Sequence, residues 1–98
     1  MADSTALALL KMDLMIATDK MDAHLTQLLD SAMQMITREG ITLSGDRAED
    51  VQLQIMYAAY LYRRRAQQDA GAMPRYLRYA LNNRLLWEKM RSEVTPLG

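Results

Sequence analysis

The amino-acid sequence predicts an all-α fold, a compact bundle of about four helices with a long central helix. Apolar residues recur three and four positions apart, which is the spacing of one face of an α-helix. Glycine occurs at only four positions and proline at only two, and they divide the chain into blocks of helical length. The 98 residues, half of them hydrophobic, suffice for one modest core, so we predict a single domain over residues 1–98.

The first two helices follow from their caps and spacing. Asp3 or Ser4 can cap a short helix that runs to about Met12, before a turn at residues 15–18. Thr18 or Asp19 then caps a longer helix over residues 20–39, which ends at a glycine that tolerates the left-handed conformation. The apolar stripe of this second helix consists of Met21, Leu25, Leu28, Leu29, Ala32, Met33 and Ile36.

The third helix is the predicted central one. Residues 46–49 read as a capping box that opens it, and it extends to about Gln68. Between Val51 and Tyr62 it carries no charge and is apolar around its whole circumference. A helix of this kind must be covered on more than one side, and a second copy of the chain is a natural source of that cover.

The last helix begins near Pro74, because a first helical turn does not need the missing N–H of proline. It directs Leu77, Ala80, Leu81 and Leu85 inward and runs to about Arg91. Residues 92–98 are then a short flexible tail.

The charges are sorted along the chain. From Met1 to Tyr62 there are nine acidic and four basic residues, a balance of −5, whereas from Arg63 to Arg91 the balance is +6. Complementary halves can attract copies of a neutral chain head to tail, which favours an assembly protein over an enzyme. The alternative is that the charges lie on solvated helix faces and are merely unevenly distributed.

We therefore predict a subunit interface with two charged sides. Its basic side consists of Tyr60, Arg63, Arg64, Arg75, Arg78 and Tyr79. Its acidic side, contributed by a neighbour, consists of Asp46, Glu49 and Asp50. Arginine and tyrosine are preferred at interfaces, but they also contact nucleic acid, or pack over the edge of a core. The three acids can equally be stabilised by the N-terminal dipole of the helix that they open.

Nine methionines are many for this length. Methionine suits surfaces that adapt to partners, and it also fills helical cores. We expect Met33 and Met56 to be core residues, whereas exposure of Met12, Met15 or Met35 would indicate an interface.

The sequence predicts no enzyme, metal site or cofactor. There is no cysteine, and the one histidine, His24, lies on a helix where Asp22 cannot face it. No phosphate-binding glycine loop and no nucleophile with a base and a carboxylate are present. Since no segment has the length of a membrane span, we expect a cytoplasmic protein with no membrane contact.

The order of these features carries a family resemblance over residues 7–91. The residues concerned are Asp13-Leu14, Asp19, Asp22, the stripe Leu25, Leu28, Leu29, Ala32 and Ile36, then Gly40-Ile41-Thr42-Leu43, Asp50, Leu53, Met56-Tyr57-Ala58, Leu61-Tyr62, Arg64, Met73-Pro74, Leu77, Leu81, Asn82 and Arg84. This arrangement resembles the small α-helical head–tail connector (adaptor, or head-completion) proteins of tailed bacteriophages and prophages.

The resemblance implies a structural protein without enzymatic activity. Copies would form a ring, a dodecamer in the virion, beneath the portal protein, and extend the channel through which DNA passes without sequence recognition. The ring would also contact a further connector or a tail-completion protein. The protein would be located at the head–tail junction of the virion, and in the host cytoplasm during assembly. Because the tail after Arg91 is short, the loops at residues 40–46 and 68–73 are the candidates for portal contact.

A small helical DNA-binding regulator is the alternative. The basic final helix and its Asn82-Asn83 pair favour it. The net charge of zero speaks against it, because general nucleic-acid binders usually carry a clear positive excess.

Overall fold

The computed structural model describes residues 2–67 and 72–94, and it confirms the all-α prediction. The helices are α1 (Ala2–Leu14), α2 (Asp22–Arg38), α3 (Ala48–Gln67) and α4 (Arg75–Val94). The described residues contain no strand. No helix among them is long and apolar enough to cross a membrane.

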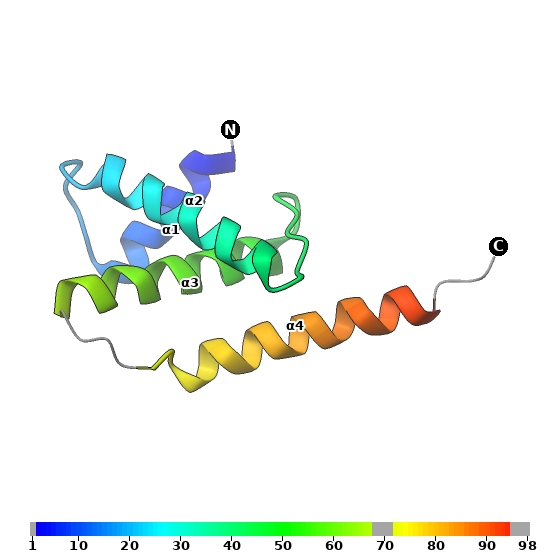
Figure 1. The fold of residues 1–98 in the computed structure, drawn as a ribbon. Helices are drawn as coiled ribbons and strands as arrows, with labels where there is room; N and C mark the ends of the chain where they lie inside the picture. The colour runs from blue at the N-terminus through cyan, green and yellow to red at the C-terminus, as the bar shows by residue number, and fades with distance from the viewer. Residues whose placement is uncertain (1, 68–71, 95–98) are drawn as a thin grey trace.

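α3 is the central helix of the bundle. α1 and α2 lie on one side of it and α4 runs along the other, with its C-terminal end projecting beyond the remaining helices (Figure 1). The apolar residues of α3 are therefore packed against other helices on both sides within one chain. Its buried residues are Leu53, Ile55, Tyr57, Ala58 and Ala59. Its other large apolar residues are only partly buried: Val51, Met56, Tyr60, Leu61 and Tyr62. α4 thus supplies part of the expected cover, and cover by a second copy stays a prediction.

α1 ends in a left-handed residue that is not glycine. Met15 has a φ of 60°, and the N–H of Ile16 donates to the carbonyl of Lys11 at 2.9 Å, which closes the last turn. A positive φ costs a residue with a Cβ on the order of 1 kcal/mol. The turn nevertheless brings Lys11 to Asp22 at 2.8 Å and to Asp19 at 3.3 Å, so α1 is tied to the start of α2.

α2 confirms the predicted stripe in five positions and corrects the helix start. The buried residues are Leu25, Leu28, Leu29, Ala32 and Ile36. The predicted caps, Thr18 and Asp19, are wrong, since the N-cap is Met21 and has no side-chain hydrogen bond. Asp19 instead uses its carboxylate for the ion pair with Lys11.

Gly40 ends α2 as predicted. Its φ of +100° is a conformation that glycine adopts without steric cost. A Cβ at this position would also lie 3.3 Å from Cδ1 of Leu85 on α4, so the turn and the fourth helix approach each other closely. Gly40 therefore both stops the helix and lets α4 come near.

The predicted capping box before α3 is wrong. The backbone N–H of Asp46 donates to Oγ of Ser44, and the Glu49 carboxylate pairs with Arg47 at 2.9 Å. The N–H of Ser44 donates to Oδ2 of Asp50 at 2.6 Å, so the residue that fixes this loop is one turn further into the helix.

α4 begins where Pro74 predicted it, since the carbonyl of Pro74 accepts the N–H groups of Leu77 and Arg78 at 3.1 Å. Leu77 and Leu81 are fully buried against the other helices. The helix continues to Val94, which corrects the predicted tail at residues 92–94. The remainder of that tail, and residues 68–71 of the preceding loop, lie outside the described residues.

Candidate functional site

The two oppositely charged halves of the sequence pair with each other inside one chain. Arg78 on α4 holds Glu39 at the end of α2 through two parallel bonds of 2.9 and 3.0 Å. Arg63 on α3 lies 3.4 Å from Asp13 on α1. A third such pair joins Arg84 on α4 to Asp50 on α3. Part of the complementarity that we predicted between copies is thus satisfied within the subunit.

Asp50 is the most deeply placed charge of the described residues, with only 1% of its surface exposed. Its carboxylate accepts hydrogen bonds from Arg84 and from the backbone N–H of Ser44. Burial alone would raise the pKa of Asp50, but these two hydrogen bonds and the charges of Arg84 and Arg47 outweigh burial and lower that pKa below its ordinary value. The prediction that Asp50 meets a neighbouring subunit is wrong, because the side chain is buried and its partner is in the same chain.

Arg84 connects three segments. Beyond Asp50, its guanidinium donates to the carbonyl of Thr42 at 2.9 Å and to Glu88 at 3.0 Å. Glu88 in turn accepts from the backbone N–H of Thr42 at 3.0 Å. The connection between α2 and α3 is therefore clamped between the first turns of α3 and the middle of α4. We call these four residues, Thr42, Asp50, Arg84 and Glu88, the polar clamp.

The remaining predicted basic residues divide between packing and exposure. Tyr60 packs edge-on against Tyr57, with ring centroids 5.9 Å apart, and its hydroxyl accepts from Arg64 at 3.4 Å. Arg75 and Tyr79 are exposed on α4. On the acidic side Asp46 and Glu49 are exposed, so these two remain accessible.

The outer face of α4 carries large exposed apolar side chains, interrupted by the exposed polar pair Asn82 and Asn83. Its large side chains are between 38% and 59% exposed, and we call them the α4 stripe: Tyr76, Tyr79, Leu86, Trp87 and Met90. They recur at helical spacing on the face opposite the buried Leu77 and Leu81. The exposed charged residues of α4 whose side chains are described, Arg75 and Lys89, are both positive.

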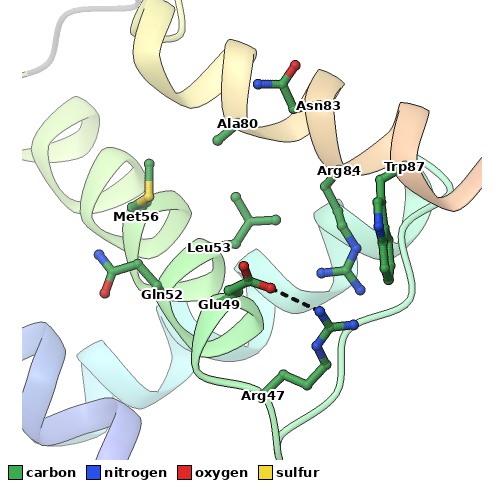
Figure 2. Close-up of a pocket in the computed structure, with 9 residues that line it drawn as sticks. All are labelled: Arg47, Glu49, Gln52, Leu53, Met56, Ala80, Asn83, Arg84 and Trp87. Carbon is green, nitrogen blue, oxygen red and sulfur yellow. Dashed lines mark hydrogen bonds and ion pairs between the residues drawn. The ribbon is translucent and has the colours of Figure 1, made fainter.

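A groove of about 480 Å³ lies between α3 and α4 and adjoins this stripe (Figure 2). Leu53, Met56 and Ala80 contribute apolar surface to its lining, and Trp87 stands at one end. The guanidinium groups of Arg47 and Arg84 lie 5.0 and 5.1 Å from the centre of the Trp87 ring. Such cation–π contacts fix the indole in place at the edge of the groove.

A second group of exposed apolar side chains lies at the C-terminal end of α1 and in the turn that follows it. Met12 is 73% exposed and Met15 91%, and Leu9 lies one turn before Met12. We call these three residues the α1 patch. Met35 is also exposed. The exposure that we took as an indication of an interface is therefore found for Met12, Met15 and Met35. Met33, which we expected in the core, is exposed as well, whereas Met56 packs against the core.

The described residues contain no cluster of three or more histidine, cysteine or acidic side chains that could hold a metal ion. His24 lies beside Tyr62, with ring centroids 6.5 Å apart, at the contact between α2 and α3.

The chain matches no protein-family model, and comparison with curated proteins and with solved structures finds no significant similarity.

Proposed function

We propose that this chain is a structural subunit of a phage head–tail connector, which forms a ring beneath the portal protein and extends the DNA channel. The observation that carries this proposal is the α4 stripe with its adjoining groove. Single apolar side chains are expected on any surface, but five large ones on one side of a helix, beside a groove, favour an interaction site. Tyrosine, tryptophan and methionine are also the residue types enriched at the centre of protein interfaces.

The motif order that resembles phage connectors supports the same role. Several residues of that resemblance lie where α4 meets the bundle: Asp50, Leu53, Leu77, Leu81 and Arg84. These residues of the resemblance are thus among those that attach α4 to the bundle, and they leave the outer face of α4 exposed. In the proposed ring this face is available for a neighbouring subunit, the portal protein or a tail-completion protein, and the role assigns no catalytic residue.

The test is the solution mass of the purified chain, measured by light scattering after gel filtration, with negative-stain imaging of the same fractions. We expect a discrete closed oligomer with a central channel. A monomer at every concentration and salt, with no rings seen, would contradict self-assembly of the isolated chain. Failure to bind portal rings as well would refute the proposal.

The DNA-binding alternative has one observation in its favour, since the described exposed charges of α4 are positive and lie among aromatic side chains. Fluorescence anisotropy with a labelled duplex tests it. A binding regulator would show log K falling with log salt, with a slope near −0.9 for each phosphate contacted. No binding at low salt would exclude it.

A further inference from the structure

We propose that the α4 stripe and the α3–α4 groove are partly covered by the α1 patch of a second copy of this chain. This inference rests on the proposed ring and names the two surfaces that would form its subunit contact. It replaces the purely charged interface that the sequence predicted.

The positions of the two surfaces favour a contact between copies. α1 lies on one side of α3 and α4 on the other, so the α1 patch cannot cover the stripe of its own chain (Figure 1). When the patch of one copy docks on the stripe of another, the first copy keeps a free stripe and the second keeps a free patch. A contact between two different surfaces therefore repeats, and it yields a ring where the rotation closes.

The chemistry of the two surfaces is complementary. Met12 and Met15 are unbranched and polarizable, so they can fill an irregular groove, and methionine sulfur makes favourable contacts with aromatic rings. The stripe offers three such rings, on Tyr76, Tyr79 and Trp87. The left-handed turn at Met15 leaves this side chain almost wholly in water, so docking would give it the contacts that it lacks within the chain.

The patch is shorter than the stripe. From Tyr76 to Met90 the stripe spans about 21 Å, at 1.5 Å per helical residue. From Leu9 to Met15 the patch spans about 9 Å by the same measure. The patch therefore fits within the stripe and covers less than half of its length.

The charges beside the two surfaces are complementary. The exposed charged residues of α4 whose side chains are described, Arg75 and Lys89, are both positive. The turn that follows the α1 patch carries Asp19, whose side chain is 92% exposed. Its partner Lys11 is largely buried, so the carboxylate is the more accessible member of that pair.

Two double variants test the assignment. Met12→Lys with Met15→Lys blocks the patch, and Tyr79→Lys with Leu86→Lys blocks the stripe. All four residues are exposed, so folding should persist, and circular dichroism verifies it. Gln27→Lys with Gln34→Lys, on the exposed face of α2, is the control with the same change of charge. We expect each blocking variant to weaken self-association about 100-fold, and the control to leave it unchanged.

Mixing the two blocked variants gives the decisive result. Each retains the surface that the other lacks, so one intact contact can form and the pair should stop at a 1:1 dimer. In ¹⁵N-labelled Tyr79→Lys/Leu86→Lys protein, amide signals of residues 9–15 should shift when unlabelled Met12→Lys/Met15→Lys protein is added. They should not shift when further unlabelled Tyr79→Lys/Leu86→Lys protein is added.

The outcomes separate this inference from the proposed function. Rings that form normally from both blocked variants would leave the connector standing and overturn the assignment of surfaces. If the amide signals of residues 9–15 do not shift in the mixture at millimolar concentration, the assignment of surfaces is also overturned. This holds even if the wild-type chain assembles only on a portal, because the mixture tests the contact without a ring. Loss of self-association in the stripe variant alone, with the patch variant unaffected, would indicate pairing of α4 helices. The remaining outcome is that duplex DNA competes with self-association and binds more tightly to the stripe variant. That outcome would assign the stripe to nucleic acid and overturn the contact between copies.

Discussion

The body, formed by α1, α2 and α3, differs from the fourth helix in the balance of forces that hold it. The body is joined mainly by apolar packing, with Leu10, Leu25 and Ile36 fully buried and its ion pairs at the surface. α4 contributes two fully buried leucines, 77 and 81, and two partly buried apolar residues at 80 and 85, and it is also attached through arginine–carboxylate pairs. The difference shows what the sorted charges of the sequence do. The basic half supplies the arginines and the acidic half supplies most of the carboxylates that attach the last helix.

These two kinds of contact respond differently to perturbation. Apolar burial is non-directional and nearly independent of salt and pH, whereas an ion pair fixes orientation and weakens when either partner is neutralised. We therefore expect α4 to be the part of the molecule whose attachment can be altered without unfolding the rest. The following experiments are arranged from the largest expected effect to the smallest.

Replacing Arg84 with Met should be the most damaging single change. It leaves the Asp50 carboxylate buried without its cation, which typically costs about 3–5 kcal/mol. Urea denaturation followed by circular dichroism measures the free energy of unfolding. Asp50→Asn added to Arg84→Met should recover part of the loss, since the neutral amide still accepts from Ser44. A loss below about 1 kcal/mol for Arg84→Met would show that the polar clamp does not secure α4.

Leucine truncations compare the two regions directly. Leu25→Ala in the body and Leu81→Ala on α4 both remove fully buried side chains, and each should cost about 2–5 kcal/mol. Amide hydrogen exchange distinguishes them. Leu25→Ala should speed exchange in all four helices, whereas Leu81→Ala should speed it first in α4. Equal acceleration in α2 for both variants would mean that α4 and the body unfold as one unit.

Acid should weaken the polar clamp. The pKa of Asp50 is lower in the folded chain than its ordinary value of 3.8, so the folded state binds its proton less readily than the unfolded state. The resulting stability is present above pH 3.8 and is lost as pH falls through the folded pKa, below that value. Urea denaturation between pH 7 and pH 3 should show a steeper decline for the wild type than for Asp50→Asn. Parallel curves would contradict the assignment.

The pair between Arg78 and Glu39 should contribute least. Both side chains are partly exposed, and pairs of this kind are worth about 0.2–1 kcal/mol. Arg78→Ala should therefore lower the free energy of unfolding slightly, and less so at high salt. Arg75→Ala, an exposed arginine three residues away, is the matched control and should change it by less than about 0.5 kcal/mol.

The sequence predicted those features that depend on local spacing. The stripe of α2, the stop at Gly40 and the start of α4 after Pro74 each follow from residues within a few positions of one another. The start of α2 could not be predicted in this way. Asp19 has the composition of a cap, but its carboxylate is taken by Lys11 on another helix.

Contacts between distant residues were beyond sequence patterns for the same reason. Asp50 and Arg84 are 34 positions apart, and either could have been a solvated surface charge. The sequence held two signals of this pair. One is an acid, Asp50, directly before an uncharged apolar segment, and the other is an arginine, Arg84, within a leucine-rich helix. The outward direction of Leu86 and Met90 also depends on which face of α4 the body covers, so the candidate surface emerged only from the structure.

Trp87 gives the chain an intrinsic optical probe. It is the only tryptophan, so indole fluorescence comes from one place, beside two arginines at the edge of the groove. Release of α4 would expose the ring to water and move its emission to longer wavelength, whereas a partner seated in the groove would move it to shorter wavelength. Attachment of α4 and occupation of the groove can thus be followed in real time on the unlabelled protein.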